Sequence, residues 1–167
     1  MNPVKVGVLG LGTVGGGTVN VLNRNADEIA RRAGRSIQVV RAAAKSYDPG
    51  TLEGLDRIDV GDDAFAVVDD PEIDIIVELI GGYSPARELV LKAIGNGKLV
   101  VTANKALIAL YGNEIFEAAH EKGVTVAFEA AVAGGIPIIK AVREGLAANR
   151  IEWIAGIING TGNFILT

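Results

Sequence analysis

The chain has 167 residues, enough for one domain with a sizeable core or for one domain and part of another, and its 49% hydrophobic and 22% charged residues are typical of a globular protein. A net charge of −4 without a basic run argues against nucleic acid as a partner, and no apolar stretch is long enough to predict a membrane span. The absence of cysteine excludes disulfides and thiol chemistry, and together with the single histidine it argues against a zinc site. We expect a soluble, cytoplasmic protein.

A short apolar segment and a glycine-rich turn open the chain. Residues 4–9 have the length of a strand, and Gly10, Gly12 and Gly15 follow in the G-x-G-x-x-G spacing of dinucleotide-binding folds. In this motif the three glycines allow a tight turn, a close approach to a pyrophosphate, and close packing of helix on sheet. The pyrophosphate would lie on free N–H groups at the helix N-terminus. The predicted nucleotide contacts in this turn are Gly10, Leu11, Gly12, Thr13, Val14 and Gly15.

Strand-like and helix-like segments alternate along the rest of the chain. Further strands are expected at residues 37–44, 74–79, 99–102, 124–129 and 151–158. Helices are expected at residues 13–32, 63–68, 84–94, 104–122 (with a possible break at Gly112-Asn113) and 137–148. Ser84 is the expected N-cap of the third of these helices, with Pro85 at its first position. Residues 47–62, rich in Asp, Gly and Pro, are expected to form a loop with at most a short element.

This alternation predicts the fold class. Short connections between strands and helices favour an α/β protein with a doubly wound, mostly parallel sheet covered on both faces, a Rossmann-like dinucleotide-binding fold. In such a sheet the ligand binds in a crevice at the carboxyl ends of the strands.

The end of the second expected strand bears on the identity of the cofactor. Rossmann proteins that use NAD place an Asp or Glu there, which binds the ribose 2′-hydroxyl. Here the segment reads Ala43-Ala44-Lys45-Ser46, with no carboxylate before Asp48. The cation of Lys45 suits a 2′-phosphate, so the sequence favours NADP and leaves NAD open. The alternative explanation of Lys45 is a solvated lysine at the start of a loop.

Two further strand ends carry polar or flexible residues. Gly81-Gly82 would let the chain pass close to a cofactor ribose, with a plain turn as the alternative. Lys105 stands in the first turn of an expected helix, where its charge opposes the helix dipole. A ligand that is anionic or polarised would offset this cost, which favours a functional lysine over a solvated one. The predicted cofactor contacts on this edge are Gly81, Thr102, Asn104 and Lys105, in addition to Lys45 and Ser46.

The sequence also narrows the reaction type. None of the three tyrosines begins a Tyr-x-x-x-Lys motif, and the absence of cysteine excludes aldehyde oxidation through a thioester. A hydride transfer assisted by lysine remains. Glu129 is a single carboxylate in a strongly apolar stretch, and burial of an unpaired carboxylate is costly. We therefore expect Glu129 to have a cation, backbone donors or a ligand as its partner.

Taken together, the motifs resemble homoserine dehydrogenases. The resembling segments run in order along nearly the whole chain and are Gly10–Gly15, Val77–Gly82, Thr102–Ala106, Glu129–Pro137 and Gly156–Leu166. The resemblance implies reversible reduction of L-aspartate 4-semialdehyde to L-homoserine with NADPH or NADH, on the route to threonine and methionine. It also implies that Lys105 is a catalytic-site lysine near the nicotinamide and the substrate. The implied ligands of a monovalent cation, sodium or potassium, are Glu129, Val132, Gly134 and Ile136.

The resemblance further implies how the chain is divided. Residues 1–133 would form the dinucleotide-binding domain, and residues 134–167 the start of a substrate and dimerisation domain. In the family a substrate-binding part and a second catalytic lysine follow the Asn159-Gly160-Thr161 segment, and the full-length protein would be a homo-oligomer. We therefore expect this chain to bind nucleotide with little or no turnover. The alternative is a non-catalytic nucleotide-binding or sensing module on the same fold.

Overall fold

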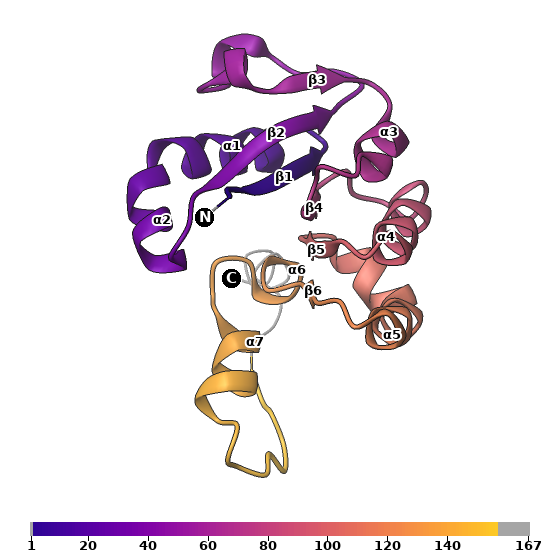
Figure 1. Ribbon diagram of the computed structural model, residues 1–167. Helices are drawn as coiled ribbons and strands as arrows, with labels where there is room; N and C mark the ends of the chain where they lie inside the picture. The colour runs from indigo at the N-terminus through magenta and orange to yellow at the C-terminus, as the bar shows by residue number, and fades with distance from the viewer. Residues whose placement is uncertain (1, 157–167) are drawn as a thin grey trace, which may run out of the picture.

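A single six-stranded sheet forms the centre of the computed structural model, which describes residues 2–156 (Figure 1). All strand pairs are parallel, and the order is β3-β2-β1-β4-β5-β6. The strands are β1 (Val4–Leu9), β2 (Ile37–Ala43), β3 (Asp59–Gly61), β4 (Ile75–Glu78), β5 (Leu99–Thr102) and β6 (Val126–Ala127). The order reverses between β1 and β4, which places a topological switch point at the carboxyl ends of these two strands. The predicted α/β, doubly wound, Rossmann-like fold is confirmed.

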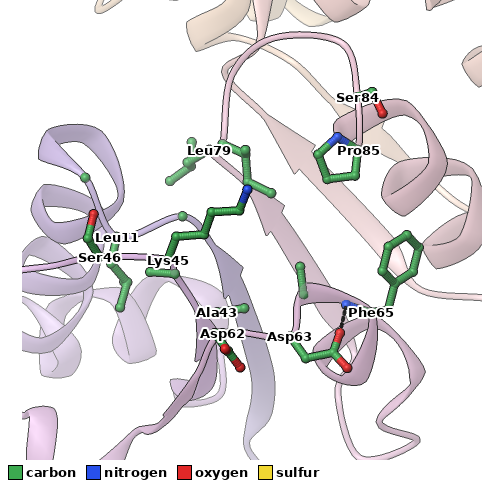
Figure 2. Close-up of a pocket in the computed structure, with 15 residues that line it drawn as sticks. Leu11, Ala43, Lys45, Ser46, Asp62, Asp63, Phe65, Leu79, Ser84 and Pro85 are labelled. Atoms are coloured by element: carbon green, nitrogen blue, oxygen red, sulfur yellow. Dashed lines mark hydrogen bonds between the residues drawn. The ribbon is translucent and has the colours of Figure 1, made fainter.

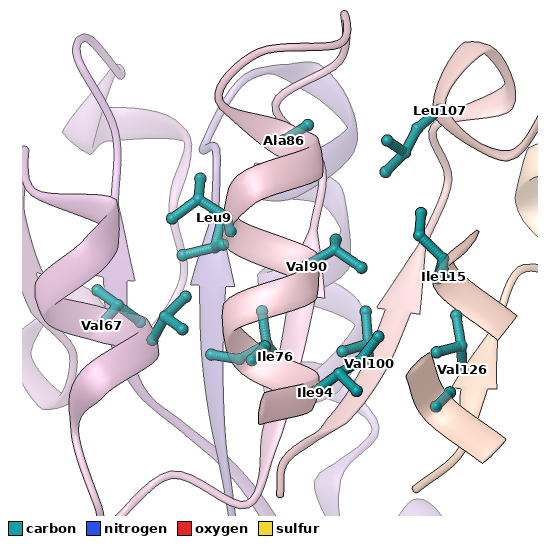
Figure 3. Close-up of a cluster of buried hydrophobic side chains, with 14 of the residues drawn as sticks. Leu9, Val67, Ile76, Ala86, Val90, Ile94, Val100, Leu107, Ile115 and Val126 are labelled. Carbon is teal, nitrogen blue, oxygen red and sulfur yellow. The ribbon is translucent and has the colours of Figure 1, made fainter. Parts of the chain in front are cut away.

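Helices pack against both faces of this sheet. They are α1 (Thr13–Arg24), α2 (Ala26–Ala33), α3 (Ala64–Asp69), α4 (Ala86–Gly95), α5 (Lys105–Lys122), α6 (Ala130–Ala133) and α7 (Ile138–Lys140). On one face, Val19 of α1 lies in a buried cluster with Val6 and Val8 of β1. On the other face, α3, α4 and α5 bury a larger cluster, in which Leu9 and Ile76 pack near Val90 (Figure 3).

The two faces are covered unequally. Side chains alternate along β5, so that Val100 is buried in the larger cluster whereas Leu99 and Val101 point to the other face and are exposed. Within residues 2–156, α1 and α2 cover that second face over β2 and β1, and Val77 of the next strand, β4, is also buried in their cluster (Figure 1). The expected cover on both faces is therefore present over β1, β2 and β4, whereas the described residues leave Leu99 and Val101 of β5 exposed on the second face.

Several predicted elements differ from the structure. The helix expected at residues 13–32 is divided at Asn25, whose φ of −105° and ψ of 20° depart from helical values. The loop expected at residues 47–62 contains two single 3₁₀ turns, Pro49–Thr51 and Leu55–Arg57, and it also supplies the edge strand β3. Arg41 on β2 stabilises that edge, because its guanidinium donates to Asp59 on β3 over 3.0 Å.

The C-terminal part differs most. The expected helix 137–148 is reduced to α7 and a π turn, Ala141–Gly145. The expected strand 151–158 is wrong for residues 151–156, which have no regular secondary structure, while residues 157 and 158 lie outside the described range. Ile151, Trp153 and Ile154 are exposed, so they are not buried against the sheet. Figure 1 shows α7 and the segment after it extending away from the sheet.

The starts of α5 and α4 show how well the sequence predicts helix boundaries. The helix expected from residue 104 begins there, capped by Asn104 with its Oδ1 accepting the N–H of Leu107 over 3.1 Å, and α5 is unbroken at Gly112. In contrast, α4 begins at Ala86 and Ser84 does not cap it; the Ser84 hydroxyl lies 3.5 Å from a carboxylate oxygen of Glu88. Over the part of the chain described, no helix is both long and apolar enough to span a membrane.

Candidate dinucleotide-binding site

The three glycines of the turn after β1 meet three different surroundings. Gly10 has a φ of +94°, and a Cβ there would lie 2.8 Å from the carbonyl oxygen of Leu79. A Cβ on Gly15 would lie 1.9 Å from the carbonyl oxygen of Gly10, so only glycine allows α1 to start this close to the turn. A Cβ on Gly12 would meet no atom of the described chain within 4 Å. The turn is therefore closed at Gly10 and Gly15 and open at Gly12, where a pyrophosphate could approach.

A cavity of about 510 Å³ opens beside this turn (Figure 2). Four segments meet around it: the glycine turn, the end of β2, the start of α3 and the loop after β4. It lies at the carboxyl ends of β1, β2 and β4, which is the switch point of the sheet. The lining residues are Gly10, Leu11, Gly12, Ala43, Ala44, Lys45, Ser46, Asp62, Asp63, Ala64, Phe65, Leu79, Ile80, Ser84 and Pro85.

Lys45 contributes a cation and Phe65 an aromatic ring to the lining of this cavity. The exposed side chain of Lys45 extends from the end of β2 across the cavity toward Leu79 (Figure 2). Phe65 presents a half-exposed ring from α3, and its backbone N–H donates to the Asp63 carboxylate over 2.8 Å. Sequence reasoning selected Lys45 and Ser46 but missed Phe65 and Asp62. The helix expected at residues 63–68 placed α3 in the chain, but no local pattern indicates which side chains of α3 face the glycine turn.

A second group of polar residues lies where β4 and β5 end. The fully buried Glu78 carboxylate accepts hydrogen bonds from the N–H of Ile80 (2.9 Å), the N–H of Gly81 (3.3 Å) and the hydroxyl of Thr102 (2.6 Å). The Thr102 hydroxyl in turn accepts the N–H of Asn104 over 3.0 Å. We call these residues, Glu78, Thr102 and Asn104, the Glu78 network.

The network brings together two segments selected from the sequence. The Asn104 side-chain amide donates to the carbonyl of Gly82 over 2.7 Å, so the Gly81-Gly82 loop is joined to the start of α5. Thr102 and Asn104 are themselves buried, and their side-chain hydrogen bonds lie inside the protein. Lys105, the next residue, is exposed at the first position of α5. The role of each as a cofactor contact stays a prediction.

The Glu129 carboxylate accepts hydrogen bonds from the backbone. Its two carboxylate oxygens accept the N–H groups of Ile139 (2.8 Å) and Lys140 (2.9 Å) at the start of α7. Among residues 2–156, no group of three or more His, Cys, Asp or Glu side chains is arranged to hold a metal ion. Of the expected carbonyl ligands, that of Ile136 accepts the N–H of Ile138 over 2.8 Å. The predicted cation site at Glu129, Val132, Gly134 and Ile136 therefore stays a prediction.

The sequence matches two family models. The first is described as "Homoserine dehydrogenase, NAD binding domain" and matches residues 10–129; the second, "Homoserine dehydrogenase", matches residues 137–167. The homoserine dehydrogenase of Pseudomonas aeruginosa is 70% identical over 167 residues, and that of Methylobacillus glycogenes is 59% identical over the same length. Both alignments cover the whole of this chain, but only 38% and 40% of the relatives, so the chain spans less than half of their length.

Solved structures agree with the sequence matches. A crystal structure of a homoserine dehydrogenase from Thiobacillus denitrificans has a TM-score of 0.93 and 70% identity, and the match covers 99% of this chain and 38% of that one. A hyperthermophilic archaeal homoserine dehydrogenase in complex with NADPH has a TM-score of 0.69 and 27% identity over 88% of this chain and 50% of that one. The residues that form the crevice are thus those that match the NAD-binding model, and the chain belongs to the homoserine dehydrogenase family, whose NAD-binding domain it contains.

Proposed function

We propose that the protein carrying this chain is a homoserine dehydrogenase, which reversibly reduces L-aspartate 4-semialdehyde to L-homoserine, and that this chain supplies its cofactor site. The observation that carries the proposal is the position of the glycine turn and Lys105. These segments are far apart in the sequence, yet both lie at the carboxyl edge of one sheet, on the two sides of its switch point. A dinucleotide placed across the switch point would reach from the cavity at Lys45 to the start of α5.

In this proposal each segment has a defined task. The open backbone at Gly12 and the first turn of α1 receive the pyrophosphate, because α1 begins there without a side-chain cap. NADPH, when bound, supplies the hydride. The exposed ammonium of Lys105 donates a hydrogen bond to the aldehyde oxygen of the substrate, where negative charge develops as the hydride arrives. In the reverse direction the same ammonium stabilises the alkoxide of homoserine.

The test of this function is an assay of homoserine-dependent reduction of NADP⁺ and NAD⁺ in the full-length protein. We expect turnover in the wild type and a loss of about 100-fold or more in kcat for Lys105→Ala, because a donor to a developing oxyanion is removed. Nucleotide binding without any turnover of homoserine would instead favour the non-catalytic sensing module. Cytoplasmic location and homo-oligomeric assembly stay predictions.

We propose further that Lys45 selects NADP. The support is its position in the cavity, where it extends across the mouth from the end of β2, at the site of the ribose-binding residue of Rossmann folds. Replacing Lys45 by Asp puts a carboxylate where NAD-binding relatives of the fold carry one. In titrations with NADPH and NADH, we expect Lys45→Asp to weaken NADPH by about tenfold or more relative to NADH. An unchanged ratio of the two affinities would refute the assignment.

The monovalent cation is also a proposal. Sodium or potassium prefers oxygen ligands, and Glu129 together with the carbonyls of Val132, Gly134 and Ile136 offers them. The residues fit in that, among the described residues 2–156, each Glu129 carboxylate oxygen accepts a single N–H, which leaves lone pairs for an ion. We expect sodium or potassium chloride to raise the melting temperature above that in choline chloride of equal ionic strength. The effect should be absent in Glu129→Ala; equal melting temperatures of the wild type in all three salts would contradict the cation site.

The domain division is proposed on the same basis. Residues 1–133 would form the dinucleotide-binding domain and residues 134–167 the start of the next one. The support is that the two family models match on either side of this boundary, over residues 10–129 and 137–167.

A further inference from the structure

Glu78 is a buried carboxylate to which the proposed function assigns no task. It is the last residue of β4 and has no exposed surface. Within residues 2–156 no lysine, arginine or histidine forms an ion pair with it, and its partners are two backbone N–H groups and one hydroxyl. These three donors suit an ionised carboxylate, which only accepts hydrogen bonds.

Stability alone is a weak reason for a carboxylate at this position. Taking a charge out of water is costly, and apolar replacements of buried charges are often neutral or stabilising. The surrounding core is apolar, since Leu9 and Ile76 of the neighbouring strand positions are fully buried. What a carboxylate provides here, and an apolar side chain does not, is an acceptor for three donors at once.

The three donors come from the two segments that border the crevice. Ile80 and Gly81 belong to the loop after β4, in which Gly81 and Gly82 both adopt positive φ values (+79° and +71°). Because glycine backbone is flexible, the conformation of this loop depends on hydrogen bonds such as those to Glu78. Thr102 is the last residue of β5, and it passes the contact on to Asn104. Asn104 joins the two segments, because its side chain caps α5 and also donates to the Gly82 carbonyl.

The order of the strands in the sheet places the Glu78 network relative to the cofactor. Lys45 and Phe65 line the crevice over β2 and β3, which the proposed function gives to the 2′-phosphate and adenosine half. The other half of the dinucleotide then extends over β4 and β5, whose ends carry the Glu78 network.

We propose that Glu78 is a positioning residue for the nicotinamide half of the cofactor. Its carboxylate fixes the Gly81-Gly82 loop and, through Thr102 and Asn104, the first turn of α5 that carries Lys105. Glu78 itself is enclosed and contacts neither cofactor nor substrate. This inference rests on the proposed dinucleotide binding and adds to it which buried group holds the nicotinamide side in place.

The experiment compares a whole cofactor with its adenosine half. Calorimetric titration of the full-length protein with NADPH and with 2′,5′-ADP separates contacts on the two sides of the switch point. Glu78→Gln keeps the shape but leaves the Thr102 hydroxyl without its charged acceptor. We expect NADPH to bind about tenfold more weakly while the affinity for 2′,5′-ADP stays within about twofold. NADH with ADP serves as the pair if the site prefers NAD.

Lys98→Met is the matched destabilising control. Lys98 is also buried and donates to the carbonyls of Asp70 (2.5 Å) and Ile73 (2.7 Å), but it precedes β5 at the opposite edge of the sheet. We expect this variant to melt at a lower temperature and to keep the wild-type ratio of the two affinities. Equal weakening of both ligands in Glu78→Gln, or an unchanged NADPH affinity, would overturn the positioning role.

A second pair of variants keeps the inference testable if Glu78→Gln does not fold. Thr102→Val removes the hydroxyl that links Glu78 to Asn104, and Thr102→Ser retains it. We expect the valine variant to lose NADPH affinity selectively and the serine variant to bind NADPH as the wild type does. Equal losses in both variants would refute the link from Glu78 to Asn104 through the Thr102 hydroxyl. If the wild type binds neither ligand, the proposed function fails, which is a different result from a failure of the Glu78 inference.

Discussion

Gly12 and Gly15 lie three residues apart in one turn, and the structure predicts opposite consequences for their replacement. Gly15→Ala forces a Cβ to within 1.9 Å of the Gly10 carbonyl oxygen, so the turn or α1 must shift. Gly12 has a φ of −69° and open space around its Cα, so alanine fits the free protein without strain. The space above Gly12 is the space that the pyrophosphate would use.

We therefore expect Gly15→Ala to lower the free energy of unfolding by about 2 kcal/mol or more, as overpacked backbone sites do. Gly12→Ala should change it by less than about 0.5 kcal/mol and yet weaken NADPH binding by about tenfold or more. Chemical denaturation and nucleotide titration of both variants measure the two effects. Tight NADPH binding by Gly12→Ala would show that no phosphate passes over this residue.

At the same scale, some residues of the site could be read from the sequence and others could not. The spacing of Gly10, Gly12 and Gly15 carries its own geometric reason, and the turn has the form that the motif requires. Phe65 has no such signal, because only the packing of α3 beside β2 brings its ring to the cavity. Glu78 was visible as part of a motif, but its three donors come from the loop after β4 and from β5, and no spacing rule connects them.

At the scale of elements, the turn between α3 and β4 is held by Asp70. Its carboxylate accepts the backbone N–H of Glu72 over 2.9 Å and the guanidinium of Arg41 on β2 over 3.0 Å. The Glu72 N–H, and after it Arg41, hold the pKa of Asp70 below its ordinary value of 3.8, against the opposing effect of burial. A carboxyl whose pKa is lower in the folded state stabilises the fold above its unfolded pKa and loses this contribution as the pH falls further.

We expect Asp70→Asn to be less stable than the wild type at about pH 6, and the difference between the two to shrink as the pH falls below about 4. Urea denaturation at several pH values measures it. Asp59→Asn is the control, because Asp59 pairs with the same Arg41 from an exposed position and should show a smaller loss at neutral pH. A difference for Asp70→Asn that is the same at both ends of the pH range would mean that its charge is not the stabilising feature.

The elements also show where local signals suffice. The strand at residues 99–102 and the helix that starts after Asn104 lie where the sequence predicts them. Residues 84–94 and 137–148 carry helix signals as well, but Ser84 does not cap and α7 ends at Lys140. The missing factor in the second case is a packing partner, because residues 143–156 are exposed throughout. A helix signal without a surface to bury its apolar face does not determine a helix.

At the scale of the whole molecule, the half-covered sheet yields a prediction from two adjacent residues. Val100 and Val101 point to opposite faces of β5; the first is 1% exposed under α4 and α5, and the second is 39% exposed, on the face where residues 2–156 place no helix over β5. A valine-to-threonine change nearly keeps the shape and replaces one methyl group with a hydroxyl. In the 167-residue chain, Val100→Thr buries that hydroxyl in an apolar cluster and should cost about 1–3 kcal/mol.

Val101→Thr should cost less than about 0.5 kcal/mol in the same chain, because its hydroxyl stays hydrated. The free energies of unfolding of the two variants, measured by urea denaturation, check the prediction directly. Comparable costs for both would mean that the second face of β5 is covered in solution, and sedimentation at several concentrations would then identify a second copy as the cover. Unequal costs would instead show that the larger cluster under α4 and α5 stabilises the β5 half of the sheet without a cover on its second face.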